Sequence, residues 1–227
     1  MRKVRLMAPE RTLDWRPNPD PRSLLFAVSL WPCFNNGLTR ASAMRKKSVW
    51  LDQGQEGACT GFGAEHVRAL SPYRQRVSNS SAQGMYVRAK FWDEWPGEDY
   101  EGSSVNGAMK AEREAGFIKA WKWCYSLDEL DHALAFHGAV EMGSWWWSGM
   151  WSPDSDGILH MTGSKVGGHA FAVSGYRTHP KFGKQYHMDN SWGPDWGVEG
   201  GAWLSAFDMQ QLLSDDGEIA CPQKVRL

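Results

Sequence analysis

Two residues that lie far apart in the sequence, Cys59 and His169, carry the thiol and the imidazole that nucleophilic acyl transfer requires. Cys59 lies in QEGAC, and the small and apolar residues of GACTGFGAEHVRAL predict a helix that starts at this cysteine. Free N–H groups and the positive dipole at a helix start favour a thiolate. A cysteine among small residues is more often a buried structural thiol, so Cys59 becomes a candidate nucleophile only through its companions.

Two side-chain amides supply these companions. Gln53 precedes the cysteine in DQGQEGAC, where its amide can donate to an oxyanion formed beside the sulfur. His169 starts the apolar run HAFAVSGY after two glycines, which predicts a strand that carries the imidazole. A histidine alone is more often a satisfied structural residue. Here Asn190, in DNSWGPDWG, can accept from the imidazole, and the indole of Trp192 can shield that hydrogen bond from water.

These motifs occur in one order along the chain: Gln53, Cys59, His169, Asn190, and then Trp192 and Trp196 in NSWGPDW. In this order and spacing the sequence resembles the papain-like cysteine peptidases (family C1), in particular their compact bacterial and phage-type members. The resemblance implies an α+β, two-lobe fold: a helical lobe carries the cysteine, an antiparallel β-barrel-like lobe carries the histidine and asparagine, and the cleft lies between them. It also implies a cysteine endopeptidase that works through a thiolate–imidazolium pair and an acyl-enzyme, with no cofactor and no metal.

The resemblance extends to the substrate groove. EGSSVNGAMKAEREAG, from Glu101, is similar to the stretch that borders the groove in this family, so Gly102 and Ser103 are candidate backbone partners of a bound peptide. Gly168 and Trp192 are further candidate substrate-binding residues. The sequence departs from papain at Glu56, where papain has a disulfide cysteine, and at Thr60, where an aromatic residue usually follows the nucleophile. Both departures affect the expected substrate preference and leave the catalytic groups in place.

The elements that must position these residues follow from periodicity. Helices are predicted over 57–70, 81–92, 104–115, 127–136 and 207–213, the fourth with a capping box formed by Ser126 and Glu129. Strands are predicted at VEMGSWWW from Val140, HAFAVSGY, QYHMDN from Gln185, GAWLS from Gly201 and GEIAC near Glu218.

The order of these elements predicts three parts of a single peptidase domain: a largely irregular N-terminal extension (1–48), a helical lobe with the nucleophile (49–137) and a β-rich lobe with the histidine and asparagine (138–227). The long charged helix of a large pro-segment is not recognisable in the extension. We expect the extension and the tryptophan run 145–147 to shape or partly cover the groove, because neither has a catalytic role.

Composition restricts the class of partner. Lys plus Arg (25) nearly balance Asp plus Glu (26), which argues against a nucleic-acid partner. The apolar run LLFAVSLW is too short to span a bilayer, which argues against a membrane anchor. The four cysteines, Cys33, Cys59, Cys124 and Cys221, are too few and too dispersed for a disulfide framework, so a reducing, cytoplasmic location is expected. The expected partner is a peptide or protein substrate, and the oligomeric state is left open.

Two other classes remain open at this point. A cell-wall amidohydrolase of the CHAP or NlpC/P60 type also uses a cysteine followed by a histidine, but such enzymes usually bring the histidine much sooner after the cysteine and lack NSWG. A non-catalytic binding module that keeps the papain fold is the other alternative, and the intact quartet argues against it.

Overall fold

The computed structural model describes residues 11–18, 20–28, 43–44, 49–70, 72–93, 95 and 101–224. Cys33, one of the four cysteines, lies outside the described residues, as does most of the predicted N-terminal extension. Among the described residues, the helices fall short of the length and hydropathy that a membrane crossing needs.

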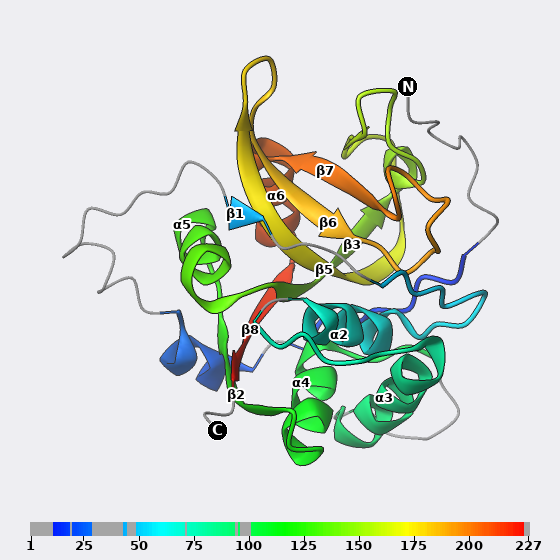
Figure 1. Ribbon diagram of the computed structural model, residues 1–227, viewed down its shortest axis with the longest axis vertical. Coiled ribbons are helices and arrows are strands. Elements are labelled where there is room, and N and C mark those ends of the chain that lie inside the picture. The colour runs from blue at the N-terminus through cyan, green and yellow to red at the C-terminus, as the bar shows by residue number, and fades with distance from the viewer. Residues whose placement is uncertain are drawn as a thin grey trace.

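Three helices pack together where the sequence predicts a helical lobe (Figure 1). They are α2 (Cys59–Ala69), α3 (Asn79–Trp92) and α4 (Val105–Glu114). Two of them begin at a serine N-cap, because the side chain of Ser78 accepts from Ser81 and that of Ser104 accepts from Gly107. No side chain caps α2, which follows Ala58. The start of this helix therefore keeps N–H groups available for other partners.

Two further helices lie beside the sheet. The helix predicted over 127–136 divides into α5 (Leu127–His132) and a π-helical turn, η2 (Ala133–His137). Ser126 caps α5 by accepting from the N–H of Glu129, as the sequence predicts. The predicted helix over 207–213 forms as α6 (Ala206–Ser214).

A mixed sheet makes up the other part of the molecule. Its order is β2-β8-β3-β5-β6-β7-β4, and β1 pairs with β5. The pairs are antiparallel except β4 with β7, which are parallel. The strands are β1 (Ala43–Met44), β2 (Ile118–Trp123), β3 (Val140–Trp147), β4 (Ile158–Leu159), β5 (Lys165–His179), β6 (Gly183–Asp189), β7 (Gly201–Ser205) and β8 (Glu218–Lys224).

Strand β2 is an element that the sequence analysis missed. It pairs with β8 at one end of the sheet order, although it falls within the segment 49–137 that was predicted to be helical. Its sequence, IKAWKW, has two lysines among the apolar residues, as edge strands often do. The predicted helical lobe therefore contributes a strand to the sheet. The boundary between residues 137 and 138 stays a prediction.

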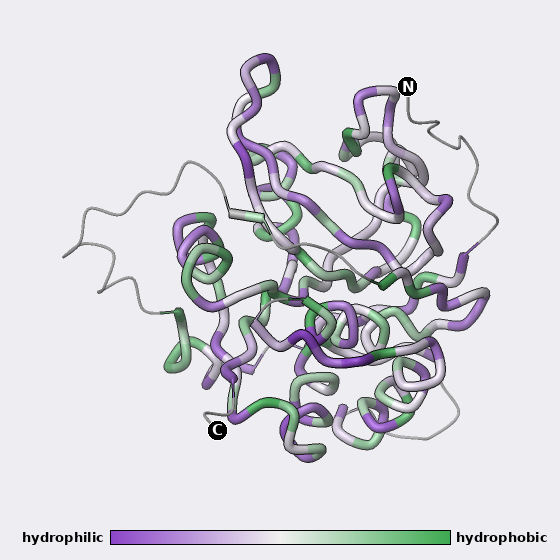
Figure 2. The backbone as a smooth tube through the Cα atoms, viewed as in Figure 1, coloured by the Kyte–Doolittle hydropathy of each residue, from purple (hydrophilic) through white to green (hydrophobic). Residues whose placement is uncertain are grey.

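The hydrophobic core has two main parts, which meet near the sheet. One lies within the β-rich part and contains Trp146, Phe171 and Trp192. The other lies between helices and sheet and contains both Cys59 and Ala170, so the predicted nucleophile packs against the strand that carries His169. Along the strands, green hydrophobic stretches alternate with white and purple ones (Figure 2).

The described N-terminal residues are more ordered than the predicted extension. Pro21–Phe26 form a 3-10 helix, η1, because Asp20 caps it and a proline stands at its start. Residues 14 and 15 make isolated parallel bridges, Asp14 to Gly168 and Trp15 to Ser103. The chain therefore passes between the start of β5 and the start of α4.

Candidate active site

Cys59 is the first residue of α2, and its side chain is fully buried. It packs with Ala170 in one buried cluster, and the backbone N–H groups of Ala170 and Asp14 act to lower the pKa of its thiol. Ala170 directly follows His169 in strand β5. The helix start therefore brings the thiol to the strand that carries the histidine, although the two lie 110 positions apart in the sequence.

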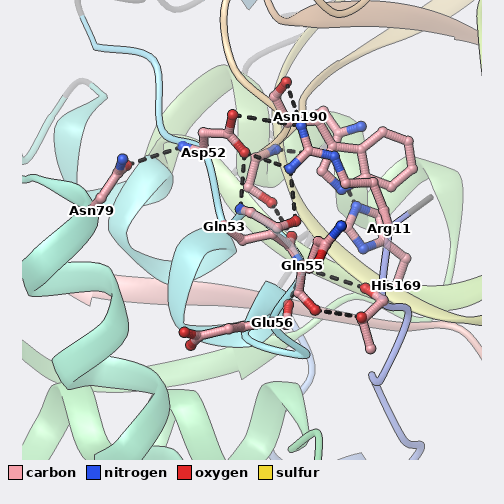
Figure 3. A network of polar contacts seen from close by, with 12 residues as sticks. Arg11, Asp52, Gln53, Gln55, Glu56, Asn79, His169 and Asn190 are labelled. Atoms are coloured by element: carbon pink, nitrogen blue, oxygen red, sulfur yellow. Dashed lines mark hydrogen bonds and ion pairs between the residues drawn. The ribbon is translucent and has the colours of Figure 1, made fainter. Parts of the chain in front are cut away.

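The ring of His169 is held at one nitrogen and left unpaired at the other. Its Nε2 lies 2.8 Å from Oδ1 of Asn190, as predicted (Figure 3). Because that amide oxygen also accepts from the N–H of Ser191 at 2.8 Å, we assign Nε2 as the protonated nitrogen. Nδ1 is buried and has no hydrogen-bond partner. An unprotonated Nδ1 has the lone pair that a general base needs.

Two tryptophans enclose this histidine. The ring of Trp192 lies 4.9 Å from that of His169, tilted by 33°, and Trp146 meets it edge-on at the same distance. Trp146 belongs to the tryptophan run, and its neighbour Trp145 is only partly buried. The predicted role of Trp192 in covering the pair of His169 and Asn190 agrees with this geometry. Its predicted role in substrate binding stays a prediction.

Gln53 joins the loop before α2 to the loop that carries Asn190. Its Oε1 accepts from Ser191 Oγ at 2.6 Å, and its Nε2 donates to the carbonyl of Glu56 at 2.8 Å. The same Nε2 lies 3.4 Å from the carbonyl oxygen of Thr12, a long contact. A peptide carbonyl thus faces the amide that the sequence predicts as an oxyanion donor.

That carbonyl belongs to a segment that we call the strap, Arg11–Arg16. Trp15 N–H donates to the carbonyl of Gly168 at 2.9 Å, and Arg16 N–H donates to that of Ser103 at 3.1 Å. A Cβ on Gly102 would lie 1.9 Å from the carbonyl oxygen of Asp14, at a φ of 91°. Three predicted substrate-binding residues, Gly102, Ser103 and Gly168, therefore contact this chain's own backbone.

Neighbouring side chains fix the walls that receive the strap. Tyr86, on α3, accepts from the N–H of Gly102 at 2.9 Å, and Ser103 Oγ donates to Asp93 at the same distance. At the other end, Arg11 pairs with Asp52 at 2.6 Å and donates to the carbonyl of Gly54 at 2.7 Å (Figure 3).

Burial under the strap shifts both reacting groups toward their neutral forms. It raises the pKa of the Cys59 thiol to about 12, although the N–H groups of Ala170 and Asp14 oppose the shift. It lowers the pKa of His169 to about 4, and the hydrogen bond to Asn190 opposes that shift. In the covered form the pair rests as thiol and neutral imidazole.

The sequence did not predict which residues of the N-terminal extension lie at the site. The extension was predicted to cover the groove in part, but no pattern in the sequence distinguishes residues 11–16 from the rest of it. Gly57 is a second omission, because a Cβ there would meet the Asp14 carboxylate at 2.1 Å. The neighbouring residue, Glu56, does not indicate this contact. Only the glycines before Cys59 indicate that another chain segment approaches closely.

No group of three potential metal ligands forms among the described residues. In the acidic loop 152–157, Asp154 accepts instead from the N–H groups of Asp156 and Ile158, at 2.9 Å each. Cys124 and Cys221 are buried free thiols.

Comparisons with known proteins find one relative in sequence and several in fold. No family model matches the chain. It is 23% identical over 188 residues to cathepsin B-like cysteine proteinase 4 of Caenorhabditis elegans, which covers 78% of this chain and 54% of that protein. The chain thus spans about half the length of this curated relative.

Solved structures share the fold at low identity. Procathepsin L 3 of the Tenebrio molitor larval midgut matches with a TM-score of 0.62 and 16% identity, over 81% of this chain and 70% of that one. Xylellain, a cysteine protease from Xylella fastidiosa, matches with a TM-score of 0.62 and 12% identity, over 100% of this chain and 99% of that one.

Proposed function

Since the chain has the papain-like fold and resembles the cysteine proteinases in sequence, we propose that it is a cysteine endopeptidase with Cys59 as its nucleophile and His169 as the acid/base partner. One observation carries the proposal. Asn190 holds Nε2 of His169, and Nδ1 is left unpaired on a residue whose neighbour, Ala170, packs with Cys59 in one buried cluster.

The reaction follows from these positions. Nδ1 of His169 takes the thiol proton as the sulfur attacks a peptide carbonyl, which gives the thiolate–imidazolium pair expected for the family. The backbone N–H of Cys59 and the amide of Gln53 hold the oxyanion, and in comparable sites one such donor contributes roughly 2.7–4 kcal/mol. His169 then returns the proton to the leaving amine. Water attacks the thioester and releases the acid with the thiol restored.

The strap makes the described form latent. It occupies the backbone partners at Ser103 and Gly168, and it places a carbonyl at Gln53. A substrate peptide needs the same positions. Activity therefore requires the strap to leave, and the ion pair forms in the uncovered site, where water lowers the cost of charge.

The substrate is a peptide or protein, as for cysteine proteases in general. We retain the proposals of a reducing, cytoplasmic location and of no nucleic-acid or membrane partner. The buried free thiols of Cys124 and Cys221 support the first, and the balanced charge supports the second.

The test compares the wild type, Cys59→Ala and the matched control Cys124→Ala, each also combined with Arg11→Ala to loosen the strap. We expect casein hydrolysis and labelling by a thiol-directed epoxide in the Arg11→Ala chains that keep Cys59, and less of both in the same chains with the strap intact. Hydrolysis by Cys59→Ala would refute the nucleophile. Peptidoglycan turnover without casein turnover would favour a cell-wall amidohydrolase, and epoxide labelling with no turnover of either would favour a non-catalytic papain-fold module.

A further inference from the structure

His66, on α2, lies seven residues after Cys59 and takes no direct part in the proposed reaction. It is buried, with 1% of its surface exposed, and Leu51 is buried to the same extent. The backbone N–H of Leu51 donates to Nε2 of the His66 ring at 3.3 Å. Because Nε2 accepts, we assign the ring as neutral with its proton on Nδ1. A helix side chain thus holds a backbone N–H two residues before Gln53.

The segment Leu51–Gln53, which we call the oxyanion loop, has a second side-chain acceptor. The N–H of Asp52 donates to Oδ1 of Asn79, the first residue of α3, at 3.0 Å. Asn79 is exposed, so water can replace its oxygen as the acceptor. His66 is buried, and a lost acceptor there leaves an unpaired N–H inside the protein. His66 is therefore the anchor that the loop can least replace.

The other edge of the oxyanion loop lies against the segment after β6. The N–H of Gln53 donates to the carbonyl of Ser191 at 2.9 Å, and the N–H of Gly193 donates to the carbonyl of Leu51 at 3.0 Å. Ser191 directly follows Asn190. The loop therefore lies between the segment that orients the imidazole and the helix that carries the sulfur.

Helix α2 connects the nucleophile to this anchor. Cys59 is its first residue and His66 its eighth, so the two lie nearly two full turns apart, roughly 10 Å along the axis and on about the same side. A helix keeps that spacing, whereas residues 54–57 between the loop and the helix form turns and bends. The hydrogen bond to His66 therefore fixes the position of Gln53 relative to the sulfur through a regular element.

We propose that His66 is a positioning residue of the peptidase, which accepts from the Leu51 N–H and so holds the oxyanion loop where the Gln53 amide reaches an oxyanion formed at Cys59. The inference rests on the proposed endopeptidase function and adds a residue to it. One oxyanion donor contributes about 10²–10³-fold to kcat in comparable sites. A misaligned Gln53 amide should lose part of this contribution, so we expect kcat to fall about tenfold without His66.

The first experiment tests the anchor without using catalysis. Amide hydrogen exchange of Leu51 is followed by NMR in full-length wild type, His66→Leu and His66→Gln. Leucine has a similar volume but no acceptor, whereas glutamine keeps an acceptor oxygen. Exchange of Leu51 should be at least about tenfold faster in His66→Leu and should return toward the wild-type rate in His66→Gln.

The matched control is His132→Leu, which replaces another buried histidine, 5% exposed, on α5. It should leave the exchange of Leu51 unchanged. Equal exchange of Leu51 in wild type and His66→Leu would overturn the proposal.

Should His66→Leu fail to fold, the ring nitrogens of the wild type decide. The ¹⁵N NMR shifts of His66 should show Nε2 unprotonated and Nδ1 protonated. A protonated Nε2 cannot accept from Leu51 and would overturn the proposal.

The second experiment measures kcat and KM on one peptide in chains that all carry Arg11→Ala to loosen the strap. His66→Leu should lower kcat about tenfold and change KM by less than about twofold, and His66→Gln should restore most of kcat. In Gln53→Ala, which lacks the amide to be positioned, His66→Leu should have little further effect. Alkylation of Cys59 by iodoacetamide, which forms no oxyanion, should keep its rate.

The possible results separate this inference from the endopeptidase. An unchanged kcat in His66→Leu, or losses of kcat that multiply fully when Gln53→Ala is added, would overturn the inference and leave the endopeptidase standing. Slower alkylation of Cys59 in His66→Leu would show damage to the thiol itself and would also overturn it. If exchange of Leu51 depends on His66 but no chain with Cys59 hydrolyses a peptide, the anchor is supported and the endopeptidase refuted.

Discussion

The backbone N–H of Trp15 donates to the carbonyl oxygen of Gly168 at 2.9 Å, and Gly168 directly precedes His169 in β5. A segment near the N-terminus is thereby fixed one residue from the imidazole. Beside this hydrogen bond the Trp15 ring lies against Gly143 and Gly168. In the proposed peptidase, this strand-like contact covers both Cys59 and the predicted substrate-binding residues.

Arg11→Ala should loosen the strap at its first residue. The change removes the ion pair to Asp52 and the hydrogen bond to the Gly54 carbonyl, together worth about 1 kcal/mol. We expect alkylation of Cys59 by iodoacetamide to become several-fold faster. Arg22→Ala, which removes the exposed ion pair to Asp20 outside the strap, is the control and should leave the rate unchanged. Equal rates in the two variants would show that Arg11 does not hold the strap.

The pH dependence of this alkylation should report the covered state. Because the pKa of Cys59 is raised to about 12, the thiolate is a small fraction at neutral pH and grows about tenfold per pH unit. The wild-type rate should therefore rise steadily from pH 6 to about 10 without a plateau. In Arg11→Ala the alkylation rate should reach a plateau at a lower pH than in the wild type. A wild-type plateau near pH 7 would contradict the protected thiol.

Gly102→Ala should expel the strap more strongly than Arg11→Ala. A Cβ would lie 1.9 Å from the Asp14 carbonyl oxygen, and the residue has a φ of 91°. We expect a lower Tm and faster alkylation of Cys59. Gly116→Ala is the matched control, because it has a φ of 76° but nothing within 4 Å of the added Cβ. That variant should share the loss of Tm that comes from backbone strain, roughly 1 kcal/mol, but not the faster alkylation. Identical behaviour of the two variants would remove the steric explanation.

Glu218→Gln should change how stability depends on pH. The pKa of Glu218 is raised from 4.5 to about 7, so the folded state binds the extra proton and its contribution is complete below pH 4.5. That contribution is lost as pH rises toward 7, by up to about 3 kcal/mol. The free energy of unfolding of the variant, relative to wild type, should therefore increase from pH 4.5 to 7. Urea unfolding at these two pH values measures it, and a constant difference would refute the shift.

The titration of His169 changes the free energy of unfolding with pH in the opposite direction, over nearly the same pH range. Its pKa is lowered from 6.5 to about 4, so the folded state resists protonation and loses stability as pH falls from 6.5 to 4. In the wild type these two pH dependences of stability offset each other. Only the difference between the variant and the wild type therefore isolates the contribution of Glu218.

Much of the fold follows from local signals. The N-caps at Ser104 and Ser126, the apolar run from Val140 and the glycines before His169 each fix an element from its own residues. β2 is not predicted in this way, because its lysines weaken the alternation and only pairing with β8 makes it a strand. The same holds for the π-turn that ends the helix predicted over 127–136.

The sequence by itself determined which side chains are available for chemistry, because residue types and their order along the chain are local facts. Cys59, His169, Asn190 and Gln53 were predicted in this way. Only the tertiary structure decided that residues 11–16 lie across these groups, that Glu218 accepts from Asn18, and that the indole of Trp15 lies against Gly143. Such contacts join segments up to about 200 positions apart. They are made by backbone carbonyls and by glycines, which leave room for another segment, and neither produces a periodic signal in the sequence.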